Sequence, residues 1–149
     1  MQREPIISTG IPVHWKKKSF HAALLLGYSF LIYLLSSWAG QNSQPLFENQ
    51  DKIEHILAYG FMAYIAWTAL RQWTVLRRCW LWAWVYAVGY GLTDEWHQLF
   101  VPGRYADLWD LVADAVGAAL AIALLELYRA RRESRIWMIL PRFSRLSLP

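Results

Sequence analysis

The sequence has little cysteine and lacks several motifs that would indicate a function. Its single cysteine, Cys79, excludes an internal disulfide and a metal site built from several cysteines. The chain contains no glycine-rich phosphate-binding loop, no internal repeat and no low-complexity segment. Any chemistry must therefore come from polar side chains that the fold brings together.

Charged residues are also scarce, and they are clustered. Only 17% of the 149 residues are charged, whereas 56% are hydrophobic and 10 are tryptophans, which is too apolar for a soluble domain of this size. The gaps between the charged clusters are about one bilayer thickness long, so the composition predicts an integral membrane protein. The net charge of +4 does not indicate a nucleic-acid partner, because the basic residues lie beside the apolar runs.

Four apolar runs predict four transmembrane helices in an all-α, antiparallel bundle. The runs are Phe20–Ala39, Ile56–Leu70, Cys79–Thr93 and Leu111–Tyr128. The first run is long for a cleaved signal peptide and lacks a clear cleavage site, so we expect it to be retained. The predicted membrane domain covers residues 20–128, between a basic N-terminal segment (1–19) and a basic tail (129–149).

The distribution of lysine and arginine predicts the orientation. One side of the predicted bundle carries a lysine triplet at 16–18, three arginines in the 71–78 linker and the arginine-rich tail. The other side carries only Lys52 and Arg104. Because an excess of basic residues marks the cytoplasmic side, we expect both termini in the cytoplasm and the stretch Asp94–Asp114 at the outer face.

Three segments at this outer end carry polar residues at helical spacing. They are Asp51, His55 and Tyr59; Asp94 and Glu95 with Gln98; and Asp107, Asp110, Asp114 and Gly117. Carboxylates at a membrane edge are costly, so we expect these faces to turn toward one another around a cavity. Asp114 stands out because it lies inside an apolar run.

The acids of this end outnumber its cations. Asp51, Glu54, Asp94, Glu95, Asp107, Asp110 and Asp114 face only Lys52 and Arg104. We expect Glu54 and Asp107 to point to water. The others cannot all be ionised, close and unpaired, so either some carry protons or a divalent cation lies among Asp94, Glu95, Asp110 and Asp114.

The candidate site residues each have two interpretations. Lys52 either snorkels to the interface or pairs with a carboxylate. His55 either hydrogen-bonds within the bundle or takes part in proton transfer or ligand binding. Arg104, aimed by a turn at Pro102 and Gly103, either pairs with an internal carboxylate or binds a phosphate. The full candidate set is Asp51, Lys52, His55, Asp94, Glu95, Gln98, Arg104, Asp110 and Asp114.

The arrangement of these residues resembles the VanZ-like family of small bacterial membrane proteins. The shared pattern is Asp51-Lys52, His55, Tyr59, Asp94-Glu95, Gln98, Pro102-Gly103-Arg104, Asp110 and Gly117. The chain departs from it at Asp114, where the family usually has asparagine. The resemblance implies a multi-pass protein of the bacterial cytoplasmic (inner) membrane with a role in the cell envelope. It does not imply that this chain confers the teicoplanin resistance after which the family is named.

Three functions fit the sequence. The first is an enzyme that acts on an envelope lipid or lipid-linked precursor, with the carboxylates and His55 as acid and base. The second is a non-catalytic binding or accessory protein of the envelope, of the antibiotic-tolerance type. The third is a small proton-coupled transporter, which would need to oligomerise. The spaced lysine, arginine and histidines of membrane phosphatases are absent. Lipid turnover in vesicles separates the first function from the others, and a counterflow assay isolates the third.

The predicted orientation can be tested with cysteine labelling in intact cells. A cysteine introduced at Ser43, in the first outer loop, should react with an impermeant thiol reagent, whereas the native Cys79 should not. Labelling of Cys79 from outside would show that the chain has the opposite orientation.

Overall fold

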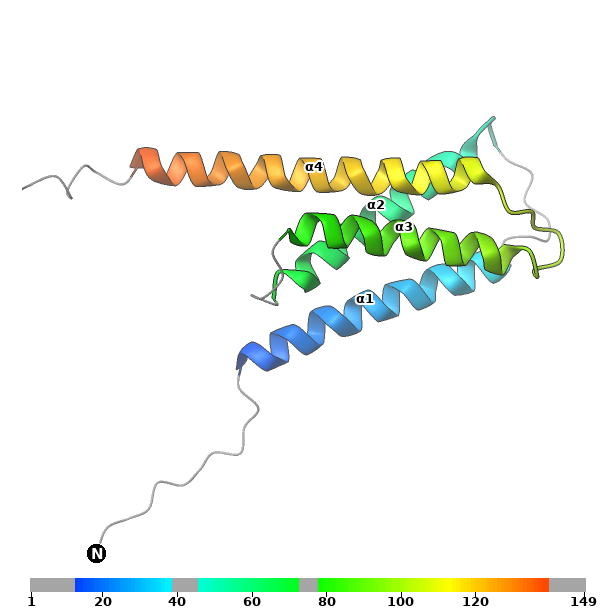
Figure 1. Cartoon of the computed structure of the whole chain (residues 1–149), viewed down its shortest axis with the longest axis horizontal. Helices are drawn as coiled ribbons and strands as arrows, with labels where there is room; N and C mark the ends of the chain where they lie inside the picture. Colours follow the sequence, from blue (N-terminus) through cyan, green and yellow to red (C-terminus); the bar gives the residue numbers. More distant parts are fainter. Residues whose placement is uncertain (1–12, 39–45, 73–77, 140–149) are drawn as a thin grey trace, which may run out of the picture.

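The computed structural model describes residues 13–38, 46–72 and 78–139, and these form four helices (Figure 1). The helices are α1 (Val13–Trp38), α2 (Gln50–Leu70), α3 (Cys79–Gln98) and α4 (Leu108–Ile139). The described residues contain no strand. The loop around Ser43 lies outside the described residues, so the orientation in the membrane stays a prediction.

Consecutive helices run in opposite directions. The end of α1, the start of α2 and the α3–α4 connection lie at one end of the bundle, and the end of α2 and the start of α3 lie toward the other (Figure 1). Within the described residues, α1 packs on α2 and α3, and α4 packs on the same two helices, so α2 and α3 are the central pair. Polar groups on α2, α3 and the start of α4 are thereby brought to one end of the bundle.

Three helices are long and apolar enough to cross a membrane: Lys18–Trp38 of α1, Gln50–Leu70, and Leu108–Arg135 of α4. The fourth helix, α3, is richer in tryptophan, tyrosine and glycine and ends in acids, which makes it less apolar. Its 20 residues nevertheless extend about 30 Å, one hydrocarbon thickness. Because α2 and α4 run in the same direction, α3 runs back between them and completes the bundle (Figure 1). The predicted membrane-embedded four-helix bundle is confirmed.

The helices extend beyond the apolar runs. Helix α2 begins at Gln50, so Asp51, Lys52 and His55 belong to its first two turns and not to a preceding loop. Asp51 lies near the helix N-terminus, where a negative charge is favourable. Helix α4 continues past residue 128 to Ile139, and Arg129 there pairs with Glu126 and Glu133 at helical spacing. The predicted basic tail is therefore helical up to residue 139.

Glycines allow the closest helix contact, which joins α2 to α4. A Cβ atom at Gly60 would lie 3.0 Å from the carbonyl oxygen of Gly117, and a Cβ atom at Gly117 would overlap the backbone of Ile56. Small residues at helix contacts let backbones approach in membrane proteins. This close approach brings Lys52 and His55 of α2 within reach of the first turns of α4.

Replacing Gly117 with alanine should destabilise the bundle, because the added methyl group meets backbone atoms that cannot rotate away. We expect Gly117→Ala to cost about 1–3 kcal/mol, measured as a lower midpoint of thermal unfolding in detergent. Gly89→Ala is the matched control, since a Cβ atom there has no neighbour within 4 Å. Alanine favours helix over glycine, so the control should be neutral or slightly stabilising. Equal stability of the two variants would contradict the proposed close contact.

Candidate functional site

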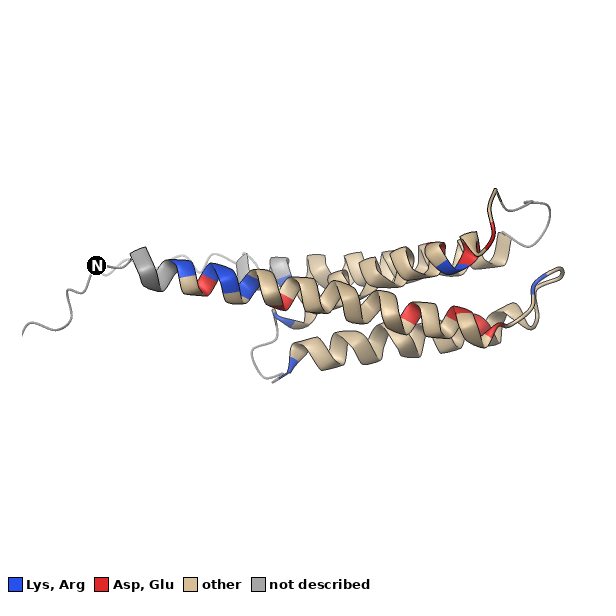
Figure 2. Ribbon diagram, turned by 90° about the horizontal axis from the view of Figure 1, so that it is seen from above, with Lys and Arg blue, Asp and Glu red and all other residues tan. Residues whose placement is uncertain are grey.

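Acidic and basic residues segregate along the bundle. Acidic positions gather at the end where α2 begins and α3 ends, whereas the basic positions of α4 gather at its far end (Figure 2). At the far end, Glu126 accepts hydrogen bonds from Trp67 Nε1 at 2.9 Å and from Arg129 at 3.1 Å. The acids of the first end have fewer cationic partners, which makes it the candidate functional site.

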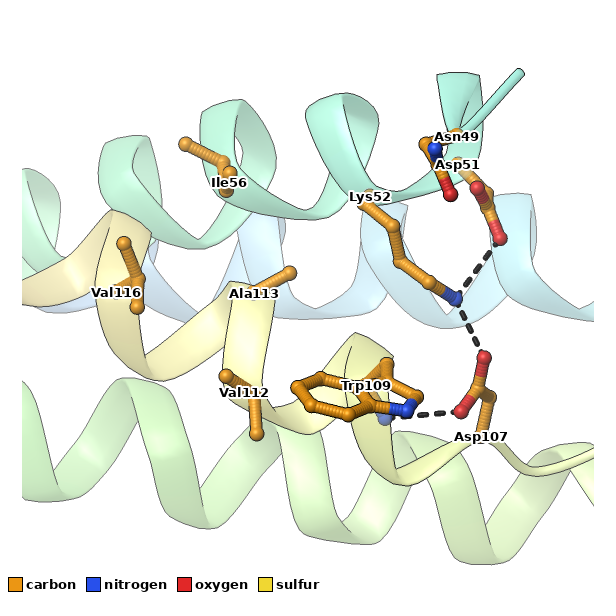
Figure 3. Close-up of a pocket in the computed structure, with 9 residues that line it drawn as sticks. All are labelled: Asn49, Asp51, Lys52, Ile56, Asp107, Trp109, Val112, Ala113 and Val116. Atoms are coloured by element: carbon orange, nitrogen blue, oxygen red, sulfur yellow. Dashed lines mark hydrogen bonds and ion pairs between the residues drawn. The ribbon is translucent and has the colours of Figure 1, made fainter.

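Lys52 is the centre of one half of this site. Its Nζ lies 3.0 Å from Asp51 Oδ2, 2.5 Å from Asp107 Oδ2 and 2.5 Å from Asp110 Oδ1. Figure 3 shows it between Asp51 and Asp107, beside a groove of about 720 Å³ that runs between α2 and α4 toward Val116. Lys52 therefore pairs with carboxylates, and three of them already share its charge.

From the sequence we expected Asp107 to point to water, but in the structure it also contacts other residues of the site. Asp107 lies directly before the first residue of α4. Its Oδ1 accepts a hydrogen bond from Trp109 N at 2.9 Å, and its Oδ2 binds Lys52. The hydrogen bond from Lys52 holds the pKa of the Asp107 carboxyl below its usual value. Glu54 is exposed, as expected, and accepts a hydrogen bond from Gln50 at 2.7 Å.

His55 joins two aspartates of α4. Its Nδ1 lies 2.8 Å from Asp114 Oδ1, and its Nε2 lies 3.9 Å from Asp110 Oδ2. Asp114 is fully buried, and its second oxygen, Oδ2, has no hydrogen-bond partner. That oxygen lies against Gly91 of α3, where a Cβ atom would overlap it. Gly91 was not among the residues predicted from the sequence. The only feature that could have indicated it is its position one helical turn before Asp94.

The acids of α3 have different surroundings. Asp94 is buried and accepts hydrogen bonds from Tyr59 at 3.1 Å and from Gln98 at 3.4 Å. Glu95 is also buried; its Oε2 accepts a hydrogen bond from the backbone N–H of Asp107 at 2.7 Å, but its Oε1 has no partner. Asp94 is thus held by neutral donors, whereas Glu95 keeps one free oxygen.

A cavity of about 250 Å³, here called the α1–α3 cavity, lies between α1, α2 and α3. Its polar lining comprises Ser36, Asp51, Glu54, His55, Tyr59, Asp94, Gln98 and Arg104. The Nε of Arg104 and the hydroxyl oxygen of Ser36 are both buried without a hydrogen-bond partner. Ser36 was also missed, because one serine in an apolar run has no periodic partner. Among the described residues, no carboxylate lies within ion-pair distance of Arg104, so the internal pair considered from the sequence is not formed.

The structure thus divides the sequence-predicted residues into two neighbouring groups. Asp51, His55, Asp94, Gln98 and Arg104 line the α1–α3 cavity. Lys52, Glu95, Asp110 and Asp114 lie beside it, and His55 touches both groups. Donor atoms of His55, Glu95 and Asp110 all lie within 4.8 Å of one another, so these three residues could hold a metal ion. His97, next to the polar stretch, instead contacts Ser37 at 2.9 Å.

Fold and site together define a small integral membrane protein with a buried polar site at one end of a helical bundle. The chain belongs to the VanZ/LLP1 family, whose pattern matches residues 8–129. Comparison with curated proteins and with solved structures gave no match.

The contact between His55 and Asp114 predicts how position 114 responds to substitution. Asp114→Asn keeps an oxygen that can accept from His55 Nδ1, so it should fold with nearly unchanged thermal stability. Asp114→Leu leaves the buried Nδ1 unpaired and should cost about 1–3 kcal/mol. Thermal unfolding of the two variants in the same detergent measures the difference. Equal losses in both would show that the charge, and not the hydrogen bond, is what position 114 contributes.

Proposed function

We propose that the protein binds the head group of a cell-envelope lipid or lipid-linked precursor in the α1–α3 cavity, at the outer face of the bacterial cytoplasmic membrane. The observation that carries this proposal is the unpaired Nε of Arg104 on the wall of that cavity. A buried guanidinium donor without a partner is unfavourable, and a phosphate oxygen is the acceptor that suits it best.

Among the described residues at this end, Arg104 forms no ion pair, and its Nε has no hydrogen-bond partner. Lys52 is already shared among three aspartates, so its charge is neutralised within the protein. The Ser36 hydroxyl adds a second unpaired polar group on the same cavity wall. Together they form an anion-binding corner contributed by α1 and by the α3–α4 connection.

The rest of the cavity wall favours a head group that also carries hydrogen-bond donors. Asp94 and Glu54 present carboxylate oxygens, which suit an ammonium group or hydroxyl groups next to the phosphate. Ile32, Leu35 and Ala58 add an apolar wall, and α1 exposes Leu31, Leu34 and Leu35 to the membrane. An acyl or prenyl chain could therefore lie along α1 while its head group occupies the cavity.

A catalytic role is the second candidate, and one observation favours it. His55 lines the cavity and is oriented from behind by Asp114, an arrangement that suits a general base or acid. Turnover of a labelled lipid in vesicles separates catalysis from binding alone. Binding in the cavity is the step that both functions require.

Lipid retention tests the proposal. The purified protein is incubated with phosphatidylethanolamine, phosphatidylglycerol or phosphatidylcholine, and bound lipid is counted by native mass spectrometry. The first two should be retained in preference, because phosphatidylcholine offers a phosphate but no hydrogen-bond donor in its head group. Arg104→Gln should weaken their binding on the order of tenfold or more, the range of a charge-assisted hydrogen bond.

The matched control is Arg131→Gln, which removes one exposed positive charge at the opposite end of α4. It should bind the lipids as the unaltered protein does. Equal loss in both variants would indicate a general charge effect, and unchanged binding in Arg104→Gln would overturn the proposed head-group site.

A further inference from the structure

We propose that His55, Glu95 and Asp110 bind a divalent transition-metal ion of the Zn²⁺ or Mn²⁺ type. Donor atoms from the three side chains lie within 4.8 Å of one another, at the place where α2, α3 and α4 meet. Two donors that each bind an ion at about 2.1 Å are at most about 4.2 Å apart, so small side-chain rotations would close the site. This inference rests on the geometry of the three residues and not on head-group binding.

Each of the three side chains is held by one atom and keeps another available. Asp110 uses Oδ1 for Lys52, and its Oδ2 faces His55 Nε2 at 3.9 Å. Glu95 uses Oε2 for the backbone N–H of Asp107, and its Oε1 is buried without a partner. Glu95 as a whole is only 6% exposed, and its Oε1 is not accessible from the surface. A buried carboxylate oxygen without a partner is unfavourable, and a cation or a hydrogen-bond donor would stabilise it.

His55 is oriented as a metal ligand commonly is. Its Nδ1 lies 2.8 Å from Asp114 Oδ1, so a proton on Nδ1 donates to this carboxylate and leaves the lone pair of Nε2 directed toward Asp110. Metal-binding histidines usually donate their second ring N–H to a carboxylate or carbonyl, which fixes the ring and raises the basicity of the ligand. Asp114 therefore acts as a positioning residue and not as a ligand.

The charges around the three residues favour a cation. Asp51, Asp107 and Asp110 share the single charge of Lys52, and Arg104 forms no ion pair with a carboxylate of the described residues. Glu95, Asp94 and Asp114 are buried without a lysine or arginine partner among the described residues. A divalent ion would reduce the repulsion that these carboxylates otherwise exert on one another.

The donor set indicates the class of metal. One imidazole nitrogen with two carboxylates suits Zn²⁺ or Mn²⁺, whereas Ca²⁺ and Mg²⁺ prefer oxygen ligands alone. Three protein ligands leave a coordination position for water or for an oxygen of a bound ligand. Zn²⁺ would hold a tetrahedral geometry here, and Mn²⁺ would complete a larger shell with water.

The test uses tag-free, chelator-treated protein in detergent. Titration with ZnCl₂ and, separately, with MnCl₂ by isothermal calorimetry should show one tight site per chain and a higher midpoint of thermal unfolding. Electron paramagnetic resonance of the Mn²⁺ sample reports whether the ion is held by the protein. Glu95→Gln should lower affinity at least about 100-fold, because it removes a charged ligand, while its amide oxygen can still accept from Asp107 N–H.

The matched control is Glu48→Gln, which removes an exposed carboxylate just before the start of α2, outside the three residues and outside the α1–α3 cavity. It should bind the metal as the unaltered protein does. His55→Gln is a second loss-of-ligand variant, and the apo forms are compared by size-exclusion chromatography and thermal unfolding. Site-specific loss in either folded ligand variant supports the proposal. The proposal is overturned if neither metal binds the unaltered protein, or if Glu95→Gln binds as well as Glu48→Gln.

Discussion

The central constraint on this structure is that one end of the membrane-embedded bundle holds buried carboxylates and has fewer basic residues than acidic ones. Lys52 compensates part of this excess of negative charge. It forms ion pairs with Asp51 of its own helix, with Asp107 just before α4 and with Asp110 of α4. Without that lysine, the approach of α2 to α4 would bring the negative charges of these aspartates together, and Asp110 among them is buried. The close backbone contact at Gly60 and Gly117 and the polar contacts above it therefore support each other.

The same constraint explains where unsatisfied groups remain. His55 links Asp114 to Asp110, and Gly91 leaves room for the buried Asp114 carboxylate against α3. Glu95 Oε1 and Arg104 Nε still lack hydrogen-bond partners. A metal ion at the first and an anionic head group at the second would complete both. The two proposals are physically compatible, because a cation among the carboxylates also lessens the repulsion that a phosphate would meet in the cavity.

The fold and the set of polar residues could be predicted because both follow from local rules. Apolar runs of membrane-spanning length gave the four helices, and spacing of three and four residues placed Asp51, His55 and Asp114 on shared faces. The roles within the set depend on how helices pack, which no local rule specifies. The sequence grouped Asp94 and Asp114 among cation ligands, whereas the structure turns Asp94 to Tyr59 and Asp114 to His55. That Ser36 Oγ and Arg104 Nε are buried without hydrogen-bond partners depends on how α1 and the 99–107 connection pack.

The central claim is that the α1–α3 cavity receives a lipid head group through Arg104. The most direct measurement is an experimental structure of the protein in nanodiscs made from its native membrane, with the lipids retained. We expect head-group density in the α1–α3 cavity, with a phosphate oxygen within hydrogen-bond distance of Arg104 Nε. A structure in which Arg104 pairs with a carboxylate of the chain while lipid head groups lie only outside the cavity would contradict it.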